Sequence, residues 1–307
     1  MSLSISTAWN AFRYSNAEAM ILELKGLGFK EVELSFSLTE EMVKTVEKMT
    51  RRGEIIVSSL HNFCPIPPGL AREEALPDYF PMSSLDERER SLCVKYTKRT
   101  IDAAARLNAG AVVLNCGRVN MRDLFRELLR MYNEGGRESS DFAGLRAELV
   151  RARAELAAPY LANVLRSLDE LNRYAEKRKV SLGVETRYYY TEIPTMEEVG
   201  TILGNFRGGR IFYWHDAGHA QVMENLGIVT QEDFLGRYKD SLLGLHLHDV
   251  RGSSDHRPPG EAELDFTRIT PFLNSGVRKV LEIHYPAGPD EVRKSRDFLE
   301  RVFDGKA

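Results

Sequence analysis

Histidines and carboxylates in this sequence gather where short apolar segments end. Four such segments in the C-terminal half read VSLGVE, IFYWHD, LLGLHLHD and VLEIH. If two glutamates, an aspartate and a histidine from these runs converged without a counter-ion, the carboxylates would repel and raise one another's pKa. Oxygen ligands with one imidazole suit Mn²⁺, Mg²⁺, Co²⁺ or Zn²⁺. These residue types therefore predict a site for one divalent ion.

The segments that carry these residues have the pattern of β-strands. Short runs rich in β-branched and aromatic residues alternate with helix-like stretches along the chain. The predicted strands are Leu3–Trp9, Glu31–Phe36, Ile55–His61, Ala111–Cys116, Val180–Glu185, Ile211–Asp216, Leu242–His248 and Lys279–His284. This alternation predicts a parallel sheet with helical crossovers, and eight repeats favour a closed (β/α)₈ TIM barrel. We expect one domain over residues 1–307, with a helix after every strand.

A barrel of this kind keeps its chemistry at the C-terminal ends of its strands. The polar residues lie at or just past those ends; they are His61, Glu185, Asp216, His219, His246, His248, Asp249, Glu282 and His284. Because side chains alternate across a strand, His246 shares a face with His248, and Glu282 with His284. Side chains from the last four strands are therefore expected to converge at the barrel mouth.

Two connections are long enough to shape that mouth. The polar, Arg/Glu-rich stretch from Arg122 to Ala157 predicts a helical excursion on top of the barrel, broken at Glu134-Gly135-Gly136. The proline-rich stretch Asn62–Ser84 predicts a lid or binding loop, unless it is disordered. A helix packed on the barrel follows the excursion, because apolar residues recur with helical spacing. They are Leu161, Val164, Leu165, Leu168, Leu171 and Ala175.

Composition limits the class of partner. The net charge is −3 and the pI about 6.2, which argues against nucleic acid. Arginines do cluster between residues 122 and 153, but interleaved acidic residues favour a solvated helix face. Three cysteines, no signal-peptide pattern and no long apolar run predict a cytoplasmic protein without a membrane partner. The oligomeric state, including a homo-oligomer, stays open.

The runs GVETR, WHDAGHA, LGLHLHDV, DHRPPGEAELDF and VLEIH, in this order and spacing, resemble the xylose isomerase-like TIM-barrel superfamily. That group includes sugar isomerases and epimerases, inosose dehydratases and endonuclease IV-like nucleases. The resemblance covers nearly the whole chain. It implies one divalent metal ion bound by Glu185, Asp216, His246 and Glu282, with Glu185 and Glu282 also acting as acid and base.

The same resemblance implies substrate contacts for His61, His219 and His256, positions that hold extra metals in the nucleases. Arg251 follows the seventh strand and could pair with a substrate hydroxyl or anion. Two departures weaken a three-metal site. Asn115 stands where the nucleases carry a histidine, and Ser254 takes the place of an aspartate, with Asp255 one position off.

The chemistry expected from these residues is proton transfer next to a carbonyl. A metal-stabilised enediolate of a small sugar, keto-sugar or polyol would form, which describes an isomerase or epimerase of carbohydrate metabolism. A dehydratase, an endonuclease IV-like hydrolase, a sugar-binding barrel without catalysis, and a partner protein that presents the Arg/Glu excursion remain alternatives.

Overall fold

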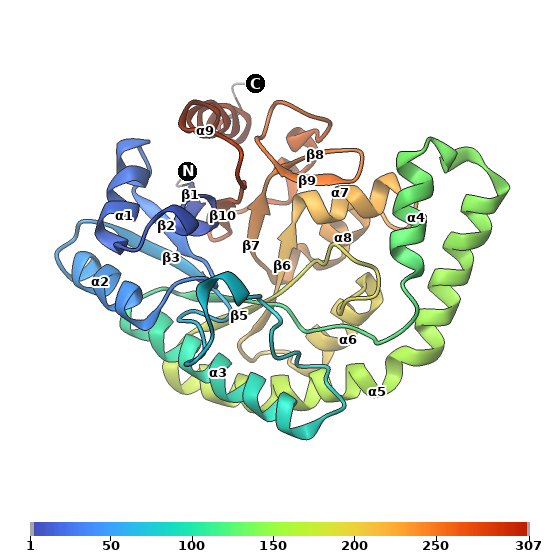
Figure 1. The fold of residues 1–307 in the computed structure, drawn as a ribbon, viewed down its shortest axis with the longest axis horizontal. Helices are drawn as coiled ribbons and strands as arrows, with labels where there is room; N and C mark the ends of the chain where they lie inside the picture. Colours follow the sequence, from blue (N-terminus) through green and yellow to red (C-terminus); the bar gives the residue numbers. More distant parts are fainter. Residues whose placement is uncertain (1–2, 306–307) are drawn as a thin grey trace.

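Eight parallel strands form a closed barrel in the computed structural model, which describes residues 3–305 (Figure 1). Around the barrel the order is β1-β10-β7-β6-β5-β4-β3-β2. The strands are β1 (Ser4–Ser6), β2 (Glu31–Leu34), β3 (Ile56–His61), β4 (Ala111–Leu114), β5 (Ser181–Glu185), β6 (Ile211–Asp216), β7 (Leu242–Leu247) and β10 (Arg278–Leu281). The predicted TIM barrel is confirmed. The first strand is shorter than predicted, because residues 7–9 turn into a 3₁₀ helix that Ser6 caps.

Helices surround the barrel and begin at residues suited to capping. They are α1 (Ala17–Gly26), α2 (Glu40–Arg51), α3 (Glu87–Arg106), α4 (Leu124–Asn133), α5 (Ser140–Arg178), α6 (Met196–Asn205), α7 (Ala217–Asn225), α8 (Gln231–Tyr238) and α9 (Pro289–Phe303). The side chains of Asn16, Thr39 and Asp86 accept backbone N–H groups at the starts of α1, α2 and α3, which satisfies donors that a helix leaves unpaired.

The prediction of a helix after every strand is wrong after β7. The segment that follows forms an antiparallel hairpin of β8 (Asp249–Arg251) and β9 (Ser254–Arg257). Only two short 3₁₀ turns come before β10, at Phe266–Arg268 and Thr270–Phe272. The run RPPG explains the difference, because consecutive prolines cannot continue a helix.

Trp214 on β6 fills the barrel beneath the strand ends. It is fully buried and clusters with Ala111, Val113 and Val280. Its indole needs glycine on the next strand, because a Cβ added to Gly244 would lie 2.4 Å from the ring. Trp214 therefore fills the barrel close to the site, where its ring contacts that of His246 edge-on.

The predicted excursion is present, but it is not separate from the helix that follows. It consists of α4 and the first half of α5, which continues unbroken for 39 residues through Pro159 (Figure 1). The predicted apolar stripe is confirmed, since Val164, Leu168 and Leu171 are fully buried. The upper part has its own core, in which Phe125 and Phe142 pack with Val222 of α7 and Val250 of β8. The excursion thus supports the hairpin that follows β7.

The arginines of the excursion divide into two groups. Arg122, Arg126 and Arg130 are exposed and pair with neighbouring carboxylates, as a solvated face requires. Arg153 is an exception to that prediction: it is 3% exposed and forms a two-pronged ion pair with Glu198 of α6, both contacts being 2.8 Å. Helical spacing alone could not predict that Arg153 is buried while its neighbouring arginines are exposed, because its partner Glu198 lies 45 residues away.

The proline-rich connection after β3 is an anchored loop over the mouth. The guanidinium of Arg72 donates to the backbone carbonyls of Ser37, Tyr14 and Ala11 at 2.6–2.9 Å. Further along the loop, Ser83 donates to the carbonyl of Arg118. The loop therefore has a defined position, which a sequence pattern of prolines could not distinguish from disorder. No helix among residues 3–305 is long and apolar enough to cross a membrane.

Candidate metal centre and cavity

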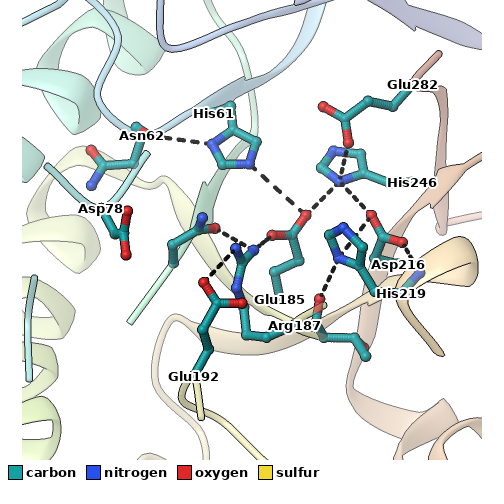
Figure 2. Close-up of polar contacts among 12 residues, drawn as sticks. His61, Asn62, Asp78, Glu185, Arg187, Glu192, Asp216, His219, His246 and Glu282 are labelled. Atoms are coloured by element: carbon teal, nitrogen blue, oxygen red, sulfur yellow. Dashed lines mark hydrogen bonds and ion pairs between the residues drawn. The ribbon is translucent and has the colours of Figure 1, made fainter. Parts of the chain in front are cut away.

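Four buried side chains from four consecutive strand positions meet at the barrel mouth (Figure 2). Each of Glu185, Asp216, His246 and Glu282 offers one ligand atom, and these atoms all lie within 4.8 Å of one another. His246 is central: its Nδ1 lies 2.6 Å from Glu185 Oε1, 3.0 Å from Glu282 Oε2 and 3.7 Å from Asp216 Oδ2. The convergence expected from alternating side chains is therefore present.

The electrostatics of this group depend on histidine and arginine neighbours. Burial raises the pKa of Asp216, but His219 and His248 outweigh it and hold the pKa well below its usual value. Burial likewise raises the pKa of Glu282, and His246 outweighs it. In turn, burial lowers the pKa of His246, whereas Glu282 and Glu33 raise it well above its usual range. The charges of the carboxylates and of the imidazole thus favour one another and oppose the effect of burial on each group.

The residues fit a divalent cation. Asp216 Oδ2 is buried and has no hydrogen-bond partner among the described residues, so one carboxylate oxygen is left for a ligand. Burying three carboxylates around one point is unfavourable unless a cation joins them. A divalent ion at Nδ1 of His246 would replace the proton there. These residues could hold a metal, and their oxygen and nitrogen donors do not choose among Mn²⁺, Mg²⁺, Co²⁺ and Zn²⁺.

A cavity of about 370 Å³ opens above this group. Its walls combine carboxylates, imidazoles and aromatic rings, which suits a small molecule with many hydroxyls. The lining residues are Phe36, His61, Pro77, Asn115, Glu185, Arg187, Tyr188, Tyr189, Glu192, His219, Asp255, His256, Glu282 and His284. The cavity adjoins two of the four ligand candidates, Glu185 and Glu282, the same two residues that the resemblance assigns to proton transfer.

Arg187 is a site residue that sequence reasoning missed. Its guanidinium contacts Glu185 and donates to Asn115 Oδ1 at 2.8 Å and Glu192 Oε1 at 3.4 Å (Figure 2). Burial raises the pKa of Glu185, and Arg187 leads the charges that bring it below its usual value. Asn115 is held by its oxygen, and its Nδ2 is buried and lacks a hydrogen-bond partner among the described residues. The sequence feature that could have identified Arg187 is its place in the run GVETR, two residues beyond the glutamate at the end of the strand.

His61 and His219 present one ring nitrogen each toward the site. Nδ1 of His61 donates to the carbonyl of Asn62 at 3.2 Å, which leaves Nε2 3.9 Å from Glu185. Nδ1 of His219 donates to the carbonyl of Thr186 at 3.0 Å, which leaves Nε2 3.5 Å from Asp255. Both residues line the cavity, as their predicted role in substrate binding requires.

The hairpin brings His256 and Asp255 to the cavity, with their side chains 3.1 Å apart. Despite its one-residue offset, Asp255 therefore places its carboxylate in the lining of the cavity. Ligand atoms of His219, His248 and His256 also form a group within 4.8 Å. However, Nδ1 of His248 accepts the backbone N–H of His256 at 2.8 Å, so its Nε2–H donates to Asp216 at 2.9 Å. His248 thereby supports Asp216.

Two strand-end residues lie further out. His284 is exposed at the rim, with its ring stacked on that of His256 at a centroid distance of 3.8 Å. Arg251 is exposed on β8, donates to the carbonyl of Glu261, and is not among the residues that line the cavity. Its placement gives no support to the predicted substrate contact.

Solved structures with the same architecture include proteins described as sugar epimerases. A D-tagatose 3-epimerase-like protein has a TM-score of 0.71 and 18% identity, covering 100% of this chain and 98% of its own. The 3-keto-D-glucoside 4-epimerase of E. coli has a TM-score of 0.69 and 15% identity, covering 98% and 99%. A protein from Thermus thermophilus, soaked with ZnCl₂, has a TM-score of 0.62 and 19% identity, covering 99% of both chains. At these identities the likeness shows the fold.

None of the curated proteins compared with this sequence matches it. A family model does match, over residues 21–302, and its description is Xylose isomerase-like TIM barrel. The matched range contains the strand ends that carry the cavity and the four converging side chains. The chain therefore belongs to the xylose isomerase-like TIM barrel family.

Proposed function

We propose that this protein is a divalent-metal-dependent isomerase or epimerase that acts on a small sugar, keto-sugar or polyol. The observation that carries the proposal is the buried group of Glu185, Asp216, His246 and Glu282, with two of its glutamates facing a 370 Å³ cavity. Two similar structures are described as an epimerase or epimerase-like, which agrees with this reaction class.

Glu185, Asp216, His246 and Glu282 would hold the ion. When bound, a divalent ion supplies Lewis acidity that favours loss of a proton next to a carbonyl. The protein's own contribution is a pair of carboxylates, at the end of β5 and just beyond β10, that both line the cavity. One glutamate removes a proton from carbon and the other returns one. Each positioned acid or base typically contributes about 10²- to 10⁴-fold in rate.

The position of proton return determines the product. Return to the same carbon from the opposite face inverts that centre, which is epimerisation. Transfer to the adjacent carbon, with the hydroxyl proton moving to the neighbouring oxygen, is isomerisation. Loss of hydroxide from the adjacent carbon instead is dehydration. His61, His219 and His256, which line the cavity, would orient the substrate hydroxyls that decide among these outcomes.

Hydrogen exchange with solvent tests this function directly. Protein purified without added metal is analysed for bound ions, loaded with each of Mn²⁺, Co²⁺, Zn²⁺ and Mg²⁺, and incubated in D₂O with ketoses, inososes and hydroxypyruvate. We expect one tightly bound ion per chain and deuterium at a carbon of at least one substrate. Bound metal without exchange would contradict the isomerase and favour a hydrolase or a binding protein. Three zinc ions per chain with cleavage of abasic DNA would identify the nuclease alternative.

A further inference from the structure

The two ring nitrogens of His246 lie in separate environments. Nδ1 faces the three carboxylates of the metal-ligand candidates. Nε2 points to the opposite side and lies 3.1 Å and 3.3 Å from the two carboxylate oxygens of Glu33. The ring itself is fully buried and held between His61, stacked at 5.8 Å, and Trp214, edge-on at 5.1 Å. The imidazole therefore has one orientation, with a different partner at each nitrogen.

Glu33 is placed to receive one proton of that ring. It lies on β2, within the barrel, and is 0% exposed. Ser59 of β3 donates to its Oε2 at 2.7 Å. A buried carboxylate only accepts hydrogen bonds and is costly without donors, so the close contact with Nε2 is an N–H donated by His246. When the proton on Nδ1 is lost, Nε2 keeps its hydrogen, and the lone pair of the neutral imidazole lies on Nδ1, where it faces Glu185 and Glu282.

We propose that Glu33 is a positioning residue that holds His246 in the Nε2-protonated tautomer, so that Nδ1 is presented to a divalent cation. This inference rests on the proposed function, because it assumes that the group of four binds an ion. Glu33 is neither one of the four candidate ligands nor a residue that lines the cavity; it would act through His246, and Ser59 would act through Glu33. Carboxylates that accept the distal N–H of a metal-bound histidine raise its basicity and typically strengthen metal binding about 10- to 100-fold.

A purely structural role for Glu33 would give a different result. In that case its loss would lower the stability of the metal-free barrel and leave the intrinsic affinity for the ion unchanged. Metal affinity and tautomer must therefore be measured apart from folding. Glu31 provides a matched control: it lies two residues earlier on the same strand and face, contacts Ser4 at 3.4 Å, and lines a separate cavity at the other end of the barrel.

The experiment compares Co²⁺ binding by wild type, Glu33→Gln and Glu31→Gln through the visible absorption of the bound ion, with circular dichroism to establish that each metal-free variant is folded. We expect Glu33→Gln to bind Co²⁺ about 10- to 100-fold more weakly, with an altered spectrum. Glu31→Gln should match wild type within about twofold, because its carboxylate has no contact with His246. In Zn²⁺-loaded wild type, nitrogen-15 NMR should show His246 protonated at Nε2.

Each result decides the question. Equal affinity of Glu33→Gln and wild type, or a His246 protonated at Nδ1 in the Zn²⁺ form, would overturn the inference and leave the proposed function intact. A wild type that binds neither ion would contradict both. If Glu33→Gln does not fold, Ser59→Ala replaces it, since it keeps the carboxylate and removes one hydrogen bond. That variant should weaken Co²⁺ binding about 2- to 10-fold, and an unchanged affinity would again overturn the inference.

Discussion

The two glutamates that face the cavity have unlike surroundings at the scale of single residues. Glu185 forms an ion pair with Arg187, which also donates hydrogen bonds to Asn115 and Glu192. Glu282 has no arginine partner in the described part of the chain; its neighbours are the imidazoles of His246 at 3.0 Å and His256 at 3.9 Å. Glu282 is therefore the residue whose carboxylate can be changed with the least disturbance of a buried ion-pair network.

We predict that Glu282→Gln lowers the rate of hydrogen exchange between substrate and solvent at least about 10²-fold, because the amide keeps an oxygen ligand but cannot take a proton. Metal occupancy should fall less than activity. His284→Asn, two residues further on at the exposed rim, should lower the rate of hydrogen exchange much less. Exchange followed by NMR and metal content followed by atomic absorption measure the two effects. Equal losses from both variants would mean that the proton-transfer residue on this segment is misassigned.

At the scale of elements, one buried carboxylate gathers several backbone groups of the segment that follows β7. Asp249 is buried and accepts four backbone N–H groups, from Val250, Gly260, Ala262 and Leu264, at 2.8–3.0 Å. Tyr188 and Asn225 hold the tip through the carbonyls of Ser253 and Gly252. These contacts fix the segment that carries Asp255 and His256 to the cavity.

Asp249→Ala should release this segment without unfolding the barrel, because it leaves several backbone donors without an acceptor. Hydrogen exchange measured by mass spectrometry should rise in residues 250–264 and stay unchanged in β4 and β5. Asp240→Ala, on the exposed turn before β7, serves as a control and should leave both regions unchanged. Increased exchange throughout the barrel would show that Asp249 supports the whole fold instead of the hairpin.

The ion pair between Arg153 and Glu198 connects two other elements, α5 and α6. Arg153→Met should destabilise the protein by about 3–5 kcal/mol, because Glu198 would remain buried without its cation. Arg151→Met, on the exposed side of the same helix, should change stability by less than about 0.5 kcal/mol. Denaturant unfolding measures the stability change of both variants. A small effect of Arg153→Met would indicate that Glu198 gains water or a proton at little cost.

At the scale of the whole molecule, the reactivity of the three thiols shows whether the barrel and its helical layer stay closed. Cys64, Cys93 and Cys116 are all buried. Burial raises the pKa of each thiol, and that of Cys116 reaches about 12. Only thiolates react quickly with disulfide reagents, so roughly one Cys116 in 10⁴ is reactive at about pH 8 even where the reagent can enter.

The native protein should therefore show no rapid reaction with Ellman's reagent, and the three thiols should react together when guanidinium chloride unfolds it. The absorbance of the thiolate that the reagent releases gives the number of cysteines that have reacted. A single fast thiol in the native protein would locate a region that opens independently. Reaction of Cys64 alone would point to the loop after β3, and reaction of Cys93 alone to α3.

The sequence by itself determined the barrel and the residues that meet at its mouth. Both follow from local rules: a strand is recognised by its apolar pattern, and alternation shows which of its side chains share a face. Parallel strands then place their ends at one rim, so polar side chains from the last four strands could be expected together, and the family resemblance singled out His246, Asp216 and the two glutamates. Periodicity also located the buried stripe of α5, because its spacing is a property of one helix.

Only the tertiary structure decided which polar residues support that site. Glu33 contacts His246 from 213 residues away, and Arg153 finds Glu198 from 45 residues away. Arg187 contacts Asn115 from 72 residues away, and the hairpin that carries Asp255 is held by Asp249 through backbone groups up to 15 residues distant. Ion pairs and hydrogen bonds act over a few ångströms in space. A local pattern therefore cannot reveal them until the closed barrel brings distant segments together.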